Sequence, residues 1–93
     1  MGKRPRMRQE RLAEKLLQIR NALGLSQTEM LKRLGFEDVL DYKRISEYEL
    51  RKNEPPLAVL LSYARVAGVC MDVLIDDEID LPTRLPGKPR HRT

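Results

Sequence analysis

The sequence has only one cysteine, Cys70, and one histidine, His91, so it offers neither an internal disulfide nor the four ligands of a usual zinc site. It contains no phosphate-binding loop, and His91 lies too close to the end of the sequence to serve as the base for a nucleophile. No apolar run approaches the roughly 20 residues that a membrane span needs. These absences predict a protein that is not an enzyme, uses no metal or cofactor and has no membrane partner.

Large aromatic side chains are also scarce, with three tyrosines, one phenylalanine and no tryptophan among 93 residues. A chain of this length forms one domain, and a core built mainly from Leu, Val, Ile and Ala favours short packed helices. The N-terminal residues lack the apolar segment of a secretory signal, so we expect a cytoplasmic protein. Cys70 stands between Val69 and Met71, which indicates a buried structural thiol.

Acidic residues are missing from both ends of the chain. Residues 1–8 carry four Lys/Arg, and residues 86–93 carry Lys88, Arg90 and Arg92. Residues 9–85 hold eleven Lys/Arg against fourteen Asp/Glu, so the net charge of +4 comes from two basic tails. Such tails are either solubilising flanks or arms that bind phosphate or the minor groove of DNA.

Hydrophobic spacing predicts two helices in the first half of the chain. The first runs over about residues 9–23, where apolar residues recur at steps of three and four, and ends at Gly24. The second opens with Ser26 as N-cap and Glu29 three residues later, which is a capping box, and stops at Gly35. Its inner face is expected to consist of Met30, Leu31 and Leu34.

Further helices are predicted in the second half. The third runs from Asp41, as N-cap, to Leu50 or Arg51, with Ile45 and Tyr48 directed inward. The fourth spans about residues 57–67 after two prolines, and the side chains expected to face inward are Leu57, Leu60, Leu61 and Ala64. A short fifth helix covers Met71 to Ile75, although Val69 to Ile75 is equally compatible with a strand. Residues 77–93 read as an extended strap followed by a basic tail, whose apolar residues pack along the domain or across a dimer.

Several motifs together resemble the phage repressor/Cro-like helix-turn-helix family, from about Leu16 to Ile75. The matching residues are Leu25-Ser26-Gln27, Leu34-Gly35, Ile45-Ser46-x-Tyr48-Glu49, Pro55, Leu60-Leu61-x-x-Ala64 and Val69 to Leu74. The resemblance implies an all-α fold, a compact four- to five-helix repressor-like DNA-binding domain with flexible basic tails. It also implies that the third helix enters the major groove, and that Glu49 is structural and pairs with a basic residue such as Arg20.

The chain departs from that family pattern at two places. The connection from Gly35 to Asp41 is about four residues longer than the family usually allows, and it carries Glu37, Asp38 and Asp41. Arg51 stands where the family commonly has a glycine. Both changes affect how the third helix is presented to DNA.

The resemblance assigns roles to residues on the second and third helices. Gln27, with Thr28, would meet the DNA backbone at a helix N-terminus and brace a side chain of the third helix; alternatively, both are ordinary first-turn residues. Lys43 or Arg44 would donate to guanine, and Glu47 would accept from a cytosine amino group. The alternative is a solvated face with a Lys43–Glu47 pair. The candidate DNA-binding residues are Lys3, Arg4, Arg6, Gln27, Thr28, Tyr42, Lys43, Arg44, Ser46, Glu47, Lys52 and Asn53.

The sequence thus favours a sequence-specific, double-stranded DNA-binding transcriptional regulator, a repressor that acts as a homodimer on an inverted repeat. It would consist of a basic arm (1–8), a helix-turn-helix domain (9–76) and a strap with a basic tail (77–93). The alternative is an antitoxin-type module that binds a toxin protein through its C-terminal segment. Ile79, Leu81 and Leu85 would then order only on that partner.

Overall fold

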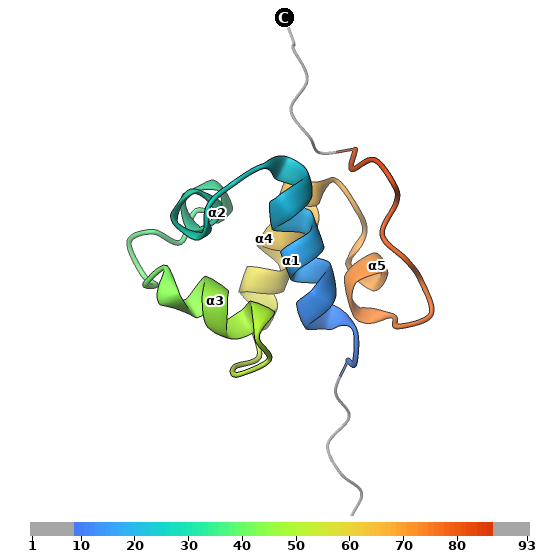
Figure 1. The fold of residues 1–93 in the computed structure, drawn as a ribbon, viewed down its shortest axis with the longest axis horizontal. Helices are drawn as coiled ribbons and strands as arrows, with labels where there is room; N and C mark the ends of the chain where they lie inside the picture. The colour runs from blue at the N-terminus through green and yellow to red at the C-terminus, as the bar shows by residue number, and fades with distance from the viewer. Residues whose placement is uncertain (1–8, 87–93) are drawn as a thin grey trace, which may run out of the picture.

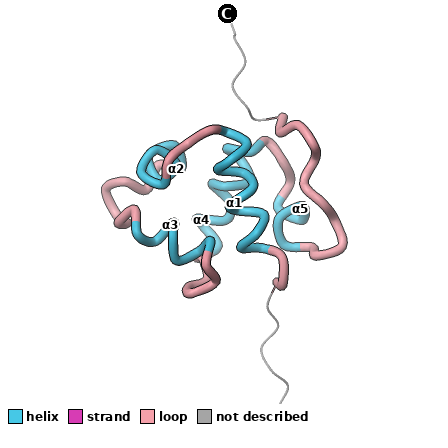
Figure 2. Tube along the Cα trace, viewed as in Figure 1, coloured by secondary structure: helices cyan, strands magenta, loops and turns pink. Residues whose placement is uncertain are grey.

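The computed structural model describes residues 9–86, so the predictions for the arm at 1–8 and the tail at 87–93 lie outside the described residues. Residues 9–86 form five helices and no strand, which confirms the all-α prediction (Figures 1 and 2). Residues 71–75 are helical, which decides between the helix and the strand expected there. The helices are α1 (Leu12–Leu23), α2 (Gln27–Leu34), α3 (Lys43–Glu49), α4 (Leu57–Ala67) and α5 (Met71–Ile75).

The first helix is the centre of the domain. α1 packs against α3, α4 and α5, while α2 packs against α3 and α4. In Figure 1, α2 and α3 lie on one side of α1, and α5 with the segment after it lies on the other. The helix-turn-helix pair and the C-terminal part of the described chain are therefore separated by α1.

Each helix contributes fully or almost fully buried apolar side chains to a single core. Leu16, Ile19, Met30, Ile45 and Leu74 have no exposed surface at all. Burial of each such side chain stabilises the fold by about 1.5–3 kcal/mol relative to an exposed one. The predicted inner faces of α2 and α3 are confirmed, since Leu31, Leu34 and Tyr48 are buried as well.

The predicted inner face of α4 is partly wrong. Leu60 and Ala64 are buried, but Leu57 is 72% exposed and Leu61 is 39% exposed. Their expected places are taken by the buried side chains of Val59, Tyr63 and Ala67. The helix is apolar on most of its circumference, so spacing alone does not decide which stripe meets α1 and α2.

The burial predicted for Cys70 is also wrong, because its side chain is exposed. Cys70 is the N-cap of α5 and has an extended backbone, which turns it away from the core that Leu74 enters. An apolar neighbourhood in sequence does not fix the direction of a residue at a helix boundary.

Two helices begin later than predicted. α1 starts at Leu12 rather than near Gln9, and its N-cap, Arg11, makes no side-chain cap hydrogen bond. α3 starts at Lys43 and ends at Glu49, with Tyr42 as N-cap in place of Asp41. The Asp41 carboxylate, one residue before this N-cap, still accepts from the N–H of Lys43 at 2.9 Å. It therefore satisfies one of the backbone donors left unpaired at the start of α3.

The segment after α5 folds back along α1. We call residues 77–86 the strap. Leu85 is buried and Leu81 is partly buried against the core, so these two leucines of the strap pack on their own domain. The Asp77 carboxylate accepts from the backbone N–H groups of Glu10 at 2.9 Å and Arg11 at 3.1 Å, and so caps the chain where it enters α1.

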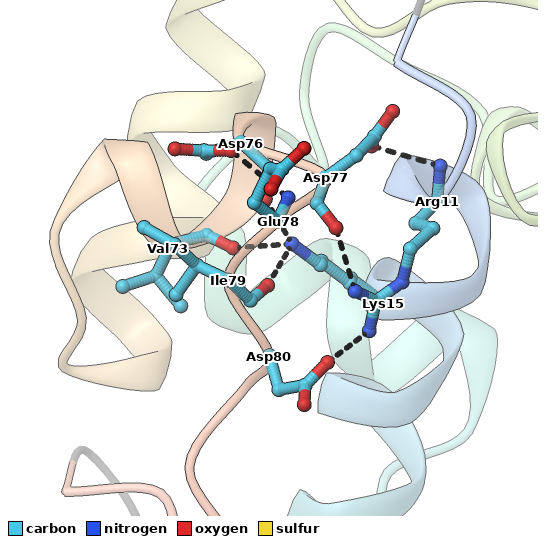
Figure 3. A network of polar contacts seen from close by, with 8 residues as sticks. All are labelled: Arg11, Lys15, Val73, Asp76, Asp77, Glu78, Ile79 and Asp80. Carbon is cyan, nitrogen blue, oxygen red and sulfur yellow. Dashed lines mark hydrogen bonds and ion pairs between the residues drawn. The ribbon is translucent and has the colours of Figure 1, made fainter.

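Two cationic side chains attach the strap and the end of α5 to α1: Lys15, which lies in α1, and Arg11, the N-cap of α1 (Figure 3). The buried Lys15 ammonium donates to the carbonyls of Val73 at 2.7 Å, Asp76 at 2.9 Å and Ile79 at 2.6 Å. Three acceptors use all three donors of an ammonium group. Burial lowers the pKa of Lys15 below its ordinary value, with a smaller contribution from the neighbouring cation Arg11.

Arg11 completes this attachment from the helix N-terminus. Its guanidinium donates to the Asp77 carbonyl at 2.7 Å and to the Asp80 carboxylate at 2.6 Å. The hydrogen bond to Asp80 raises the pKa of Arg11, so the group stays charged. Sequence reasoning assigned no role to Arg11 or Lys15, because their acceptors lie 58–69 residues away.

Candidate nucleic-acid interface

The second helix is fixed at both ends by local interactions. The Ser26 hydroxyl accepts from the N–H of Glu29 at 3.1 Å, and the Glu29 carboxylate accepts from the N–H of Ser26 at 2.8 Å, which confirms the predicted capping box. Gly35 ends the helix with a φ of 86°, a left-handed conformation that glycine adopts without steric cost. These two ends set the position at which the chain turns towards α3.

A buried ion pair holds α3 against α1. The Arg20 guanidinium donates to both carboxylate oxygens of Glu49, at 2.7 and 3.0 Å, and the side chains are only 17% and 5% exposed. This hydrogen bond raises the pKa of Arg20. The geometry confirms the expected Arg20–Glu49 pair, and its two parallel bonds restrict rotation as well as separation.

The same carboxylate links α2 to α3. The Gln27 side-chain amide donates to Glu49 Oε1 at 3.3 Å, so Gln27 braces a side chain of the third helix, as the family resemblance implied. Thr28 is exposed beside it. Side chains of three helices therefore meet at Glu49, whose contacts tie α3 to α1 and α2.

The outward face of α3 holds the predicted base-reading residues. Tyr42, Lys43 and Arg44 are exposed, whereas Ser46 and Glu47 are half-buried. Ile45 and Tyr48 anchor the opposite face in the core. The structure thus brings these five residues to one exposed surface on a helix whose other side is fixed.

Glu47 is engaged by Arg44 and Asn53 rather than by Lys43, the partner that the alternative reading of this face gave it. Arg44 Nη1 donates to Glu47 Oε1 at 2.8 Å, and Asn53 Nδ2 donates to the same oxygen at 2.7 Å. These two hydrogen bonds, that from Arg44 first, lower the pKa of Glu47. Sequence reasoning missed this network, although a spacing of three residues between Arg44 and Glu47 permits contact on a helix.

The chain leaves α3 in a strained turn. Arg51 has a φ of 64°, the only positive φ among the non-glycine residues that the structure describes. This is the position at which the resembled family commonly has glycine, the residue that adopts a positive φ without steric cost. Lys52 and Asn53 then fold back, and their N–H groups donate to the Glu47 carbonyl at 2.8 and 3.3 Å.

The start of α1 lies beside the end of α3. A small depression is lined by Gln9 and Leu12 from one end and by Tyr48, Arg51 and Asn53 from the other. The Arg51 guanidinium is 3.7 Å from the Glu10 carboxylate in an exposed pair that contributes little to stability. The described chain therefore begins next to the segment that follows the candidate reading helix.

The longer turn between α2 and α3 is anchored by Phe36 and Leu40, both partly buried against the core. The N–H groups of Val39 and Leu40 donate to the Phe36 carbonyl at 3.0 and 2.9 Å, so the insertion forms a compact turn. Glu37 and Asp38 are exposed on it. An open depression of about 450 Å³ separates this turn from α2, lined by Thr28, Leu31, Lys32, Glu37, Leu40, Asp41 and Tyr42.

Other kinds of site are not found in the described part of the chain. Within residues 9–86 there is no cluster of three or more His, Cys, Asp or Glu side chains arranged to hold a metal ion. None of the five helices there combines the length and the apolarity that crossing a bilayer requires. The exposed side of α3 and the turns flanking it form one polar surface of the domain.

Comparison with known proteins agrees with this geometry. A protein-family model described as Helix-turn-helix matches residues 16–74, which span most of α1, all of α2, α3 and α4, and α5 as far as Leu74. No curated protein and no solved structure matches the chain. Because the match covers more than half of the chain, the protein belongs to the helix-turn-helix family of the Cro/C1 type, a family of DNA-binding domains.

Proposed function

We propose that this protein is a transcriptional repressor that reads double-stranded DNA with α3 in the major groove, as a homodimer on an inverted repeat. The observation that carries the proposal is the two-sided character of α3. Its inner side is fixed by Ile45, Tyr48 and the Arg20–Glu49 pair, while its outer side is exposed. A rigid helix with a free polar face is suited to hold side chains against base edges.

The exposed face of α3 and its N-cap that is proposed to meet the bases carries five polar side chains. Lys43 and Arg44 supply donors for guanine O6 and N7, while Ser46 donates or accepts. Tyr42, at the start of the helix and 47% exposed, is placed to touch a thymine methyl group or a phosphate. Glu47 is the one acidic side chain among the five.

Contacts to the DNA backbone come from the flanking turns. Gln27 and Thr28 lie in the first turn of α2, where free N–H groups and the helix dipole favour phosphate. Lys52 and Asn53 are exposed just after α3. These contacts would position the protein on DNA without selecting a sequence.

We assign the basic arm, with Lys3, Arg4 and Arg6, to non-specific phosphate attraction. The described chain begins at Gln9, beside Arg51 and Asn53, so the arm joins the domain next to the candidate interface. If about six phosphates are neutralised overall, the logarithm of the binding constant falls with the logarithm of salt concentration at a slope of about −5. On this assignment, the domain proper comprises residues 9–76.

A dimer is proposed because one short helix reads only a few base pairs. Two copies related by a two-fold axis would read half-sites about one helical turn apart. We place the dimer surface in the segment after Gly68, where Cys70 is exposed and Ile75 is 38% exposed. The alternative of an antitoxin that orders its C-terminal segment on a toxin has no specific support, because Leu81 and Leu85 already pack on their own domain.

The test is selection from a random duplex library with the purified protein at near-physiological salt. An enriched inverted repeat is expected, with half-site centres about 10 base pairs apart. Replacing Arg44 by Ala should change the selected half-site, while removing residues 1–8 should weaken all duplexes alike and flatten the salt slope. Failure of the folded protein to enrich any motif would refute sequence-specific binding, and a motif without two-fold symmetry would refute the dimer.

A further inference from the structure

The outer face of α3 contains an acidic side chain whose donors are already present in the protein. Glu47 Oε1 accepts from Arg44 at 2.8 Å and from Asn53 at 2.7 Å. A carboxylate oxygen has two lone-pair sites, so two donors occupy Oε1 fully. A cytosine amino group would have to use the other oxygen or displace one of these partners.

We infer that Glu47 is a positioning residue, which holds Arg44 ready to read one guanine and does not read a base of its own. This inference rests on the proposed function, since it concerns how α3 reads DNA. It replaces the separate cytosine contact expected for Glu47 with a role that acts through Arg44.

The geometry of the guanidinium supports this role. Glu47 engages Nη1 of Arg44, and the opposite edge of the planar group carries the parallel donors Nε and Nη2. Two parallel donors match O6 and N7 of one guanine. A carboxylate that grips one edge of an arginine fixes the direction in which the other edge points.

Asn53 ties this arrangement to the turn after α3. Its side chain donates to Glu47 Oε1, and its backbone N–H donates to the Glu47 carbonyl at 3.3 Å. Lys52 adds a further backbone bond to the same carbonyl at 2.8 Å. Glu47 therefore connects the turn proposed to contact phosphate with the side chain proposed to contact a base.

The charges agree with a supporting role. The Arg44 side chain is 48% exposed and the Glu47 side chain 34% exposed, so in water this pair contributes little to folding. An unpaired carboxylate would repel the phosphates of a bound duplex. Paired with Arg44 and near Lys52, the charge of Glu47 is balanced within the protein.

The experiment uses the full-length protein and the duplex obtained by selection. Affinities of the wild type, Arg44→Ala, Glu47→Ala, Glu47→Gln and the double variant are measured by fluorescence anisotropy at one salt concentration. Each duplex carries a single base-pair change in the half-site. Arg65→Ala is the matched control, since Arg65 is an exposed arginine in the last turn of α4, outside the proposed interface.

Arg44→Ala is expected to lose the preference for guanine at one position by roughly 5- to 150-fold, which corresponds to one bidentate contact. Glu47→Ala should lose part of that preference at the same position and at no other. Glu47→Gln should retain more of it, because the amide oxygen still accepts from Arg44. The double variant should discriminate no worse than Arg44→Ala, and Arg65→Ala should leave both the affinity and this guanine preference unchanged.

Loss of discrimination at a different base pair in Glu47→Ala, additive with the loss in Arg44→Ala, would overturn the inference and restore a direct contact by Glu47. An unchanged guanine preference in Glu47→Ala would also overturn it. Neither result affects the proposed function, because in both the wild type still selects a site. If the wild type selects no site, the proposed function itself fails.

Discussion

Replacing Lys15 by Met tests whether the strap depends on a buried ammonium group. Methionine has a similar length and fits an apolar site, but it offers no donors. The carbonyls of Val73, Asp76 and Ile79 would each lose a hydrogen bond of 2.6–2.9 Å. The variant therefore separates the effect of the charge and its donors from the effect of filling the space.

The expected loss follows from two opposing contributions. Hydrogen bonds to a charged group stabilise by about 1.5–3 kcal/mol each, so three of them favour the native state strongly. The cost of burying the Lys15 ammonium cancels several kcal/mol of this stabilisation. In the variant, water can also reach part of the strap and hydrogen-bond to carbonyls that lost the ammonium. The net loss should be about 3 kcal/mol, a large part of the 5–15 kcal/mol that stabilises a typical domain.

The assay is urea unfolding followed by circular dichroism, with Lys32→Met as control. Lys32 is exposed on α2, so its replacement should change the free energy of unfolding by less than about 0.5 kcal/mol. Lys15→Met should lower the urea midpoint by about 1 M or more. If the two variants had the same stability, the three carbonyl contacts would not be holding the end of α5 and the strap on α1.

Three further results are expected. Arg51→Gly should raise the free energy of unfolding by about 0.5–1 kcal/mol, because glycine adopts the positive φ without steric cost, whereas Lys52→Gly should lower it in the same urea titration. Glu49→Ala leaves the Arg20 guanidinium buried without its carboxylate, so thermal unfolding should report that the free energy of unfolding falls by about 3–5 kcal/mol. A fall of less than about 1 kcal/mol would show that the Arg20–Glu49 pair does not hold α3 on α1. The pKa of Asp77 is lowered, first by the N–H of Glu10, so its stabilisation is present above the ordinary pKa of 3.8 and disappears as pH falls through the lower folded value. Asp77→Asn should flatten this acid dependence in melting curves recorded between about pH 4 and 2, and an unchanged slope would exclude Asp77 as a cap.

The parts of the fold that sequence reasoning predicted correctly are coded by neighbouring residues. The capping box of Ser26 and Glu29 lies within one helical turn, and Gly35 marks the end of the same helix by its backbone preference. The buried faces of α2 and α3 follow because each helix has one apolar stripe. Such signals depend little on the rest of the chain.

The incorrect predictions concern choices that only the assembled core makes. α4 has several possible apolar faces, and the one containing Tyr63 was selected over the one containing Leu57 because it meets α1 and α2. From the sequence alone, Lys15 would be assigned to the surface. In the folded protein it is surrounded by three carbonyls from residues more than fifty positions away in the chain. No local pattern encodes either outcome.

The candidate site shows the same division. The spacing of α3 predicted which side chains face outward, and the family pattern predicted the Arg20–Glu49 pair. It did not predict that Glu47 would engage Arg44 and Asn53, because Asn53 is brought back only by the turn at Arg51. A left-handed residue that is not glycine leaves little trace in a single sequence.

The cap that Asp77 places on the start of α1 also affects how the protein is made. A ribosome synthesises the first turn of α1 long before its capping carboxylate, which follows Arg11 by 66 residues. At about 5–20 residues per second, the nascent helix waits roughly 3–13 s for that residue. Arg20, α3 and Glu49 are synthesised within this interval, so α1, α2 and α3 can assemble on the emerging chain before the strap closes over α1.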